Sequence, residues 1–333
     1  MKFSFTVKTE PECVHYLKLL YRGKEYTLED FSDEFKSGEF SLENLLPECT
    51  LIYKEKKITF EEYSNNIKSF SNSLDFFERY QNEIIPLEID LQMSNYNYYK
   101  AAKFLEKAEE CLQTARYYLL ICQDILEYDC NLNWKTSYGA IFQVRTMNFK
   151  TAIIWYNNCF DYILQIAFLA FELYKSMPKY NSSLGFEDIL RLCTYKSIKD
   201  LHTANSSNSN LNTLWDILEK CRNGLKDINS WANFAKHKGG IGFIGLKPAS
   251  PFEVSINDAG GNIQHLTSEF ESISLDLDDS ISVLVKAHKT LYDCLNEIMD
   301  FIDFQKAIPN VCPNCQSRQI RYYGTGTQKA YDQ

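Results

Sequence analysis

Several enzyme signatures are absent from this sequence of 333 residues. It contains neither the His-Glu-x-x-His pattern of zinc proteases nor the Gly-x-Ser-x-Gly pattern of serine hydrolases. The run G-G-I-G-F-I-G follows an expected helix instead of a strand, so it predicts a helix end and a strand, not a phosphate-binding loop. Metalloprotease, hydrolase and dinucleotide-binding interpretations therefore lose their support.

Long hydrophobic segments are also absent. No apolar signal core follows the first residues, and the most apolar run, residues 162–173, contains Gln165 and Glu172. We therefore expect a cytoplasmic protein without membrane contact. Except for Cys312 and Cys315, the cysteines show neither metal nor disulfide spacing, which in a reducing compartment predicts free and mostly buried thiols.

The composition is that of a globular protein with a substantial core, because 45% of the residues are hydrophobic and 14% are aromatic. The net charge of −9 argues against a protein whose whole surface binds nucleic acid. The charge is nevertheless segregated. Lys and Arg outnumber Asp and Glu over residues 191–247, whereas acidic residues dominate residues 253–306. A local basic groove is compatible with this pattern.

Hydrophobic periodicity predicts a mainly α protein with an up-and-down four-helix bundle in residues 91–308. A small β insertion is expected at 241–266, because N-D-A-G-G-N is a strong turn signal. A tail with two cysteines follows at 309–333. The four long helices are expected at residues 95–129, 135–175 (broken or loosened near Gly139), 211–238 and 275–307.

The first 90 residues predict a small mixed α/β region that contains two similar segments. R-G-K-E-Y-T-L-E-D-F begins at Arg22, and K-E-K-K-I-T-F-E-E-Y begins at Lys54. Each has a basic turn, a short β-like piece and a Thr-x-x-Asp or Thr-x-x-Glu capping box that opens a helix. Either a duplicated turn-helix unit or a chance match explains the similarity, and we assign this region no chemistry.

A polar stripe is the main candidate site. If residues 211–238 form one helix, then apolar side chains form the adjoining face, and the helix ends at Gly239-Gly240 with basic residues in its last turn. The stripe falls within an arc of roughly 100°. Its members are Arg222, Lys226, Asn229, Asn233, Lys236 and His237.

A second stripe lies on the preceding helix, where Asn158, Asp161 and Gln165 are spaced i, i+3 and i+7. An unpartnered buried carboxylate is costly, so Asp161 is expected either to reach solvent or to pair with a cation. We infer that the two stripes face each other, with Asp161 and His237 in one pocket. The alternative is a purely structural polar network.

The segments W-Y-N-N-C-F-D, F-E-D-I-L-R-L-C-T-Y and W-A-N-F-A-K-H-K-G-G together resemble the HEPN superfamily of helical-bundle proteins. The similarity is greatest to bacterial branches whose last helical turn reads N-x-x-K-H-[KR]-G, and it covers residues 95–305. It implies a homodimer. It also implies a stress, toxin or antiviral defence setting, and in active members a metal-independent ribonuclease with an Arg-x(4-6)-His motif at the dimer seam.

Carried over to this sequence, the resemblance assigns the motif arginine to Arg222 with its polar follower Asn223, the histidine to His237 and the facing polar residue to Asp161. The spacing departs from the family, since Arg222 and His237 would be about 22 Å apart along one helix. Three alternatives follow. Arg222 acts across a dimer interface, the site is Asn233, Lys236 and His237 alone, or the catalytic motif is absent.

Two functions fit these residues. In the first, a cationic pocket binds RNA or a nucleotide phosphate, or a partner protein, without catalysis. In the second, His237 takes the 2′-hydroxyl proton of RNA while Lys236 and Arg222 hold the phosphate, with no cofactor or metal. The acidic composition and the Arg-to-His spacing favour the first.

The tail carries a separate motif. C-P-N-C at Cys312 and Cys315, followed by a basic strand and a glycine turn, resembles the first half of a zinc ribbon. Zinc requires four ligands, and no second Cys-x-x-Cys follows. Either two chains share the zinc, a distant Cys or His completes the site, or the motif binds nothing.

Overall fold

The computed structural model describes residues 2–6, 12–13, 17–35, 45–126, 137–237, 240–244, 246–247, 253–257, 263–265, 273–308, 321–323 and 327–329. The fold is mainly α with small sheets, as predicted. The chain forms two compact units. Unit 1 contains residues 1–74, 117–151 and 230–283, and unit 2 contains residues 75–116, 152–229 and 284–333. These units interleave along the chain, and the predicted domain bounds at 90 and 308 stay a prediction.

The helices of the described residues begin and end as follows. They are α1 (Leu28–Phe35), η1 (Leu46–Glu48), α3 (Phe60–Asn72), η2 (Tyr80–Ile84), η3 (Ile85–Leu87), α4 (Glu88–Ser94), α5 (Tyr96–Gln123), α6 (Ser137–Ala170), η4 (Leu173–Ser176), α7 (Phe186–Arg191), α8 (Tyr195–Ala204), α9 (Ser209–Gly224), α10 (Lys226–His237) and α11 (Leu277–Ile302). No helix among them is both long and apolar enough to cross a membrane. Gly139 lies in the first turn of α6, so the predicted break there is wrong.

The strands of the described residues form four small sheets. Among these strands, β11 pairs with β7 in parallel and the other pairs are antiparallel. Their orders are β1-β9-β10, β11-β7-β8-β2, β4-β3-β5-β6 and β12-β13. The strands are β1 (Lys2–Thr6), β2 (Glu12–Cys13), β3 (Leu17–Tyr21), β4 (Lys24–Tyr26), β5 (Thr50–Tyr53), β6 (Lys56–Thr59), β7 (Ile241–Phe243), β8 (Leu246–Lys247), β9 (Glu253–Asn257), β10 (Ile263–His265), β11 (Ile273–Leu275), β12 (Arg321–Tyr323) and β13 (Thr327–Lys329).

The β insertion of residues 241–266 is present, but it pairs with the start of the chain. Strand β9 is the partner of β1, and β8 is the partner of β2. The predicted N-terminal region therefore supplies strands to sheets of the insertion. The N-D-A-G-G-N turn lies outside the described residues, apart from Asn257 at the end of β9.

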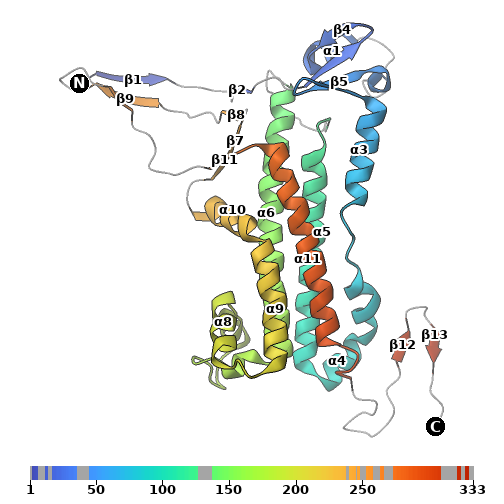
Figure 1. Ribbon diagram of the computed structural model, residues 1–333, viewed down its shortest axis with the longest axis vertical. Helices are drawn as coiled ribbons and strands as arrows, with labels where there is room; N and C mark the ends of the chain where they lie inside the picture. The colour runs from blue at the N-terminus through green and yellow to red at the C-terminus, as the bar shows by residue number, and fades with distance from the viewer. Residues whose placement is uncertain are drawn as a thin grey trace. The chain divides into compact units, whose positions relative to one another are not determined.

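The two similar segments of the first 90 residues are a true structural duplication. Each folds as a hairpin followed by a helix, β3-β4-α1 and β5-β6-α3 (Figure 1). Positive φ angles occur at both residues of each hairpin turn, as a two-residue primed turn requires. Thr59 and Glu62 form the predicted capping box of α3. Because the buried residues Leu19 and Leu51 are direct partners between β3 and β5, the two copies are related by a local twofold axis at that pair.

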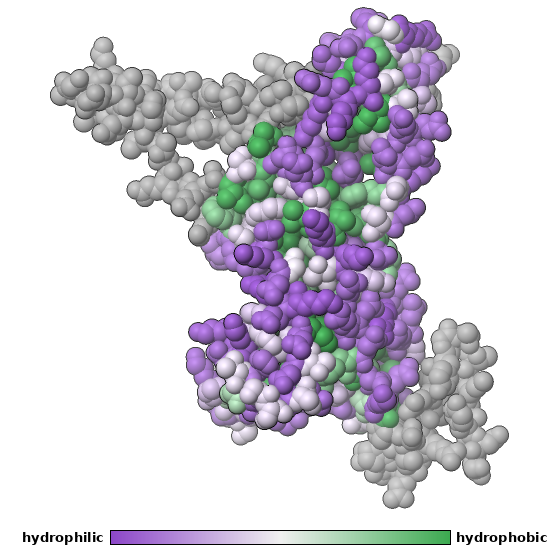
Figure 2. All heavy atoms as spheres, viewed as in Figure 1, coloured by the Kyte–Doolittle hydropathy of each residue, from purple (hydrophilic) through white to green (hydrophobic). Residues whose placement is uncertain are grey.

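In unit 2, segments of α5, α6, α9 and α11 pack around one core. The thiol of Cys159 on α6 donates to the Ala108 carbonyl of α5, and Tyr156 on α6 bonds to His288 on α11. Lys220 on α9 pairs with Glu297 on α11. The positions of these and neighbouring contacts along the helices give the relative direction of each helix. Successive long helices are antiparallel, which confirms the up-and-down arrangement (Figure 1). Hydrophilic residues cover most of the visible face over α8 and α9 (Figure 2).

The predicted single helix over residues 211–238 is wrong. Helix α9 ends at Gly224, Leu225 leaves the helical conformation with φ −101° and ψ 13°, and α10 begins at Lys226. The Leu225 N–H still bonds to the Cys221 carbonyl, and its carbonyl accepts the Asn229 N–H. Because Leu225 is buried, the break sends an apolar side chain into the core. The arc of roughly 100°, calculated for one straight helix, therefore does not apply.

Gly224 has no room for a side chain. A Cβ there would lie 2.7 Å from Cγ2 of Thr290 on α11, which is closer than carbon atoms approach each other. We expect Gly224→Ala to lower the free energy of unfolding by about 1–3 kcal/mol through overpacking. Chemical denaturation measures the change, and Thr290→Ala in the same chain should restore most of the loss. Equal stability of Gly224→Ala and the parent would contradict the close approach.

Candidate functional site

The last turns of α10 carry three of the predicted site residues. Asn233, Lys236 and His237 lie on this one helix and are all exposed. Neither Lys236 nor His237 forms an ion pair with any of the described residues. The structure therefore presents these three polar groups to solvent at one helix end. We call them the α10 surface.

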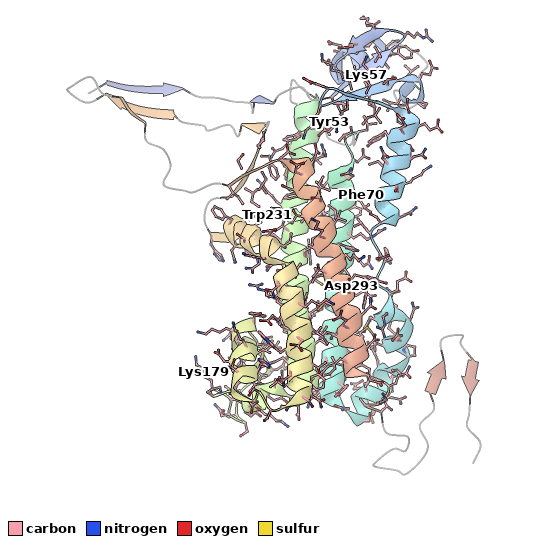
Figure 3. The ribbon with its side chains drawn as sticks, in the orientation of Figure 1. Tyr53, Lys57, Phe70, Lys179, Trp231 and Asp293 are labelled. Carbon is pink, nitrogen blue, oxygen red and sulfur yellow. The ribbon has the colours of Figure 1, made fainter. Side chains whose placement is uncertain are left out.

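An aromatic cluster supports α10 from inside unit 1. Phe149 of α6 contacts Trp231 of α10 at a ring-centroid distance of 5.8 Å and Phe243 of β7 at 5.5 Å. Trp231 therefore lies beside α6 (Figure 3), and it is half-buried. Phe149 is fully buried, so the cluster fixes α10 against α6 through side-chain packing.

Lys150, which follows Phe149 on α6, is a cation that the sequence interpretation did not single out. Its ammonium lies 5.5 Å from the ring centroid of Phe243, and the side chain is half-buried. Burial lowers the pKa of Lys150, and no carboxylate among the described residues forms an ion pair with it. Desolvation without a counter-ion is unfavourable for a cation. An anion bound next to Lys150 would therefore be stabilised by its charge.

Arg222 occupies a different setting, on α9 in unit 2. Its guanidinium lies 5.6 Å from the ring centroid of Phe160 on α6 and 5.5 Å from that of Tyr195 on α8. The side chain is half-buried. These contacts give Arg222 a packing role that joins three helices of unit 2.

Asp161 also belongs to unit 2, where it is exposed on α6 between Asn158 and Gln165 of the polar stripe. Its exposure agrees with a carboxylate that reaches solvent, and the alternative of a cation partner stays a prediction. Burial raises the pKa of the Cys193 thiol, and the negative charge of Asp161 raises it further, so Asp161 lies close to that thiol. Asn158 and Gln165 are half-buried on the same helix.

The structure thus brings Asn233, Lys236 and His237 together on α10, whereas Arg222 and Asp161 fall in the other compact unit. The shared pocket of Asp161 and His237 stays a prediction, as does the action of Arg222 across a dimer. The described residues contain no group of three or more His, Cys, Asp or Glu side chains arranged to hold a metal ion. Cys312 and Cys315 of the tail lie outside the described residues, and zinc binding there stays a prediction.

A second polar cluster in unit 1 is structural in character. Arg145 of α6 is 1% exposed and donates to the Cys122 carbonyl at 2.7 Å, the Tyr53 hydroxyl at 3.1 Å and Oδ1 of Asp278 at 2.9 Å. Lys54 reaches Oδ2 of Asp278 at 2.6 Å. Each of the three guanidinium nitrogens therefore donates to an acceptor. The cluster ties the duplicated hairpin (Tyr53 is labelled in Figure 3) to α6 and α11.

The small number of charged residues in α6 could have revealed Arg145 and Lys150 from the sequence. Helix α6 has 34 residues but its charged residues are Arg145, Lys150 and Asp161 alone. A charge on such an apolar helix is expensive unless it is paired or functional. The sequence interpretation considered Asp161 and overlooked the two cations.

Comparisons with known proteins identify no family for this chain. It matches no protein-family model, no curated protein and no solved structure. Membership of the HEPN superfamily therefore stays a prediction, together with the homodimer, the partner protein and the defence setting that the resemblance implies.

Proposed function

We propose that this chain binds RNA or nucleotide phosphates without cleaving them, through the α10 surface together with Lys150. The observation that carries the proposal is the half-buried ammonium of Lys150, which lacks an ion pair among the described residues and lies next to an aromatic ring. A phosphate oxygen would supply the missing counter-charge. Cytoplasmic location is part of this proposal.

The chemistry of the surroundings suits a nucleic-acid strand. Lys236 and His237 add exposed cationic or hydrogen-bonding groups, and Asn233 adds an amide that can bond to a base or a sugar. Trp231 offers part of an aromatic face, and Ile244, which follows Phe243 in the chain, is 56% exposed. Cations next to aromatic side chains are the combination that single-stranded nucleic acids recognise.

The helix itself does not help to bind an anion here. The end of α10 carries the negative end of the helix dipole, so the side chains must provide the attraction. This favours weak, salt-sensitive binding over the tight phosphate sites found at helix N-termini. The net charge of −9 points the same way, because the rest of the surface repels a polyanion.

The test is fluorescence anisotropy with a labelled single-stranded RNA at several salt concentrations. We expect measurable binding that weakens steeply as salt rises, and a loss of roughly tenfold in affinity for Lys150→Ala with Lys236→Ala in one chain. The matched control is Lys100→Ala. Lys100 also lies over aromatic rings without an ion pair among the described residues, but it belongs to α5 in unit 2.

Two results would overturn the proposal. If the parent shows no salt-sensitive binding, or if Lys100→Ala weakens binding as much as the paired substitution, this surface is not the site. The same samples, incubated with EDTA and run on a gel, report on catalysis. We expect intact RNA. Cleavage that disappears in a folded His237→Ala variant would replace simple binding by the ribonuclease alternative.

A further inference from the structure

Four free thiols lie in the core of unit 2, one on each long helix. Cys111 is on α5, Cys159 on α6, Cys221 on α9 and Cys294 on α11, and all four are buried. Neither the proposed binding surface nor the Arg145 cluster uses them. Buried thiols usually serve as small apolar side chains, so a functional role needs a specific geometric reason.

The pair Cys221 and Cys294 has such a reason. Their side chains lie within hydrogen-bonding reach of each other, and this contact, followed by burial, raises the pKa of the Cys294 thiol. The thiol of Cys159, in contrast, is directed at the Ala108 carbonyl, to which it donates at 3.4 Å. Burial raises the pKa of the Cys159 thiol, and the negative charges of the nearby Cys111 and Cys294 raise it further, but among the four thiols only Cys221 and Cys294 share a side-chain hydrogen bond.

Two further contacts hold α9 and α11 together at the level of this pair. Immediately before Cys221, Lys220 pairs with Glu297 at 2.5 Å. Three residues after it, Gly224 packs so closely on Thr290 that no Cβ could be accommodated. The helices therefore keep the two sulfurs in register, and a disulfide would require them to approach from hydrogen-bonding separation to about 2.05 Å.

We propose that Cys221 and Cys294 are a modification site, at which a peroxide oxidises the two thiols to a reversible disulfide that joins α9 to α11. One thiolate attacks hydrogen peroxide, which breaks the O–O bond and leaves a sulfenic acid and hydroxide. The second thiol attacks the sulfenic sulfur, an S–S bond forms, and water leaves. In total, two thiols and one hydrogen peroxide give one disulfide and two water molecules.

The burial of both sulfurs determines how the reaction proceeds. The thiolate is the reactive species, so oxidation should be slow at neutral pH and faster at alkaline pH. Hydrogen peroxide is small enough to reach the pair during brief local openings of α9, whereas a bulky alkylating reagent is not. A dithiol reductant should restore both thiols by thiol–disulfide exchange.

The experiment treats the full chain with hydrogen peroxide, blocks the remaining thiols and maps peptides by mass spectrometry without reduction. We expect a linked Cys221–Cys294 peptide that has lost two hydrogens and disappears after dithiothreitol treatment. The oxidised chain should unfold about 5 °C or more higher, because the cross-link closes a long loop. Amide hydrogen exchange in α9 should slow as well.

Variants sharpen the result. Cys221→Ser and Cys294→Ser should each abolish the linked peptide and the rise in Tm. Cys159→Ser, a matched substitution of another buried core thiol, should leave both unchanged. Oxidation of Cys221 or Cys294 that stops at sulfinic acid, or a disulfide from either of them to Cys111 or Cys159, would overturn the proposal. The peptide map of the unmutated chain decides these outcomes even if a variant fails to fold.

Discussion

Replacing Asp278 by alanine is expected to lower the free energy of unfolding by about 3 kcal/mol, the largest single effect that we expect in unit 1. The substitution leaves the guanidinium of Arg145, which is 1% exposed, without its charged partner. It also removes the acceptor of the Tyr53 hydroxyl and one partner of Lys54. Water cannot reach the buried guanidinium to replace the carboxylate, so the lost interaction is not compensated. Urea denaturation measures the resulting change in the free energy of unfolding.

Asp279→Ala is the matched control for this prediction. Asp279 is the next residue in the first turn of α11, so the control removes the same favourable interaction with the helix dipole. It forms no ion pair with the described residues, and we expect a change of at most about 1 kcal/mol. Equal destabilisation by the two substitutions would mean that the helix dipole, not the Arg145 cluster, is the source of the effect.

The same cluster predicts acid sensitivity. Burial raises the pKa of Asp278, but the charge of Arg145 and hydrogen bonds from Lys54 and Tyr53 outweigh burial and lower it below the ordinary value of 3.8. The unfolded chain therefore binds this proton at a higher pH than the folded chain. The stabilisation is complete above pH 3.8 and is lost as the pH falls through the lowered pKa. Asp278→Ala should lack this part of the acid transition.

Replacing Glu109 by glutamine should have the second largest effect, and with the opposite sign. Glu109 of α5 is 5% exposed, and its Oε2 accepts the Tyr80 N–H at 3.1 Å. Burial raises the pKa of Glu109 to about 7, although the Tyr80 N–H lowers it in part. At pH 8 the folded chain must therefore keep the Glu109 carboxylate ionised although it is buried away from water. Glutamine keeps the acceptor oxygen without the charge.

The pH dependence follows from the sign of this shift. Between the ordinary value of 4.5 and about 7, the folded chain binds more protons at Glu109 than the unfolded chain does. Stability due to Glu109 is thus fully present below pH 4.5 and is lost as the pH rises through 7. We expect Glu109→Gln to match the parent near pH 5 and to exceed its free energy of unfolding by about 2–3 kcal/mol at pH 8.

Urea denaturation at several pH values tests this prediction, with Glu110→Gln as the control. Glu110 is adjacent on α5 but exposed, so its substitution should leave the pH profile unchanged. If Glu109→Gln is less stable than the parent at pH 8, ionised Glu109 makes a favourable interaction that outweighs its burial. In that case Glu109→Gln should be the less stable chain at pH 8, and its free energy of unfolding should approach that of the parent as the pH falls.

Local patterns predicted most of the helices and the duplicated hairpins. Helical periodicity predicted α5, α6 and α11 with ends shifted by a few residues, and the Thr59 capping box predicted the start of α3. The break at Leu225 was missed because its apolar side chain continues the helical period across the junction. The pairing of β1 with β9 was also missed, since a strand carries no local mark of a partner that is distant in the chain.

The candidate site was predicted in part. The exposed group of Asn233, Lys236 and His237 is where the pattern placed it, at the end of a helix that precedes a strand. Lys150 was missed, because its importance comes from the neighbouring Phe243, which lies far away in the sequence. Arg222 was assigned to the same stripe through a continuous helix that does not exist.

The amino-acid sequence by itself determined which stretches are helical, where two hairpin-helix units repeat and which polar groups end α10, because caps, turns and 3.6-residue periods act over a few residues. Tertiary structure alone decided that α9 and α10 are separate, that Arg145 and Asp278 form a pair and that Cys221 and Cys294 lie where α9 packs on α11. Each of these depends on packing between segments distant in the chain. The energy of such contacts comes from burial and charge pairing that exist only once the helices are assembled.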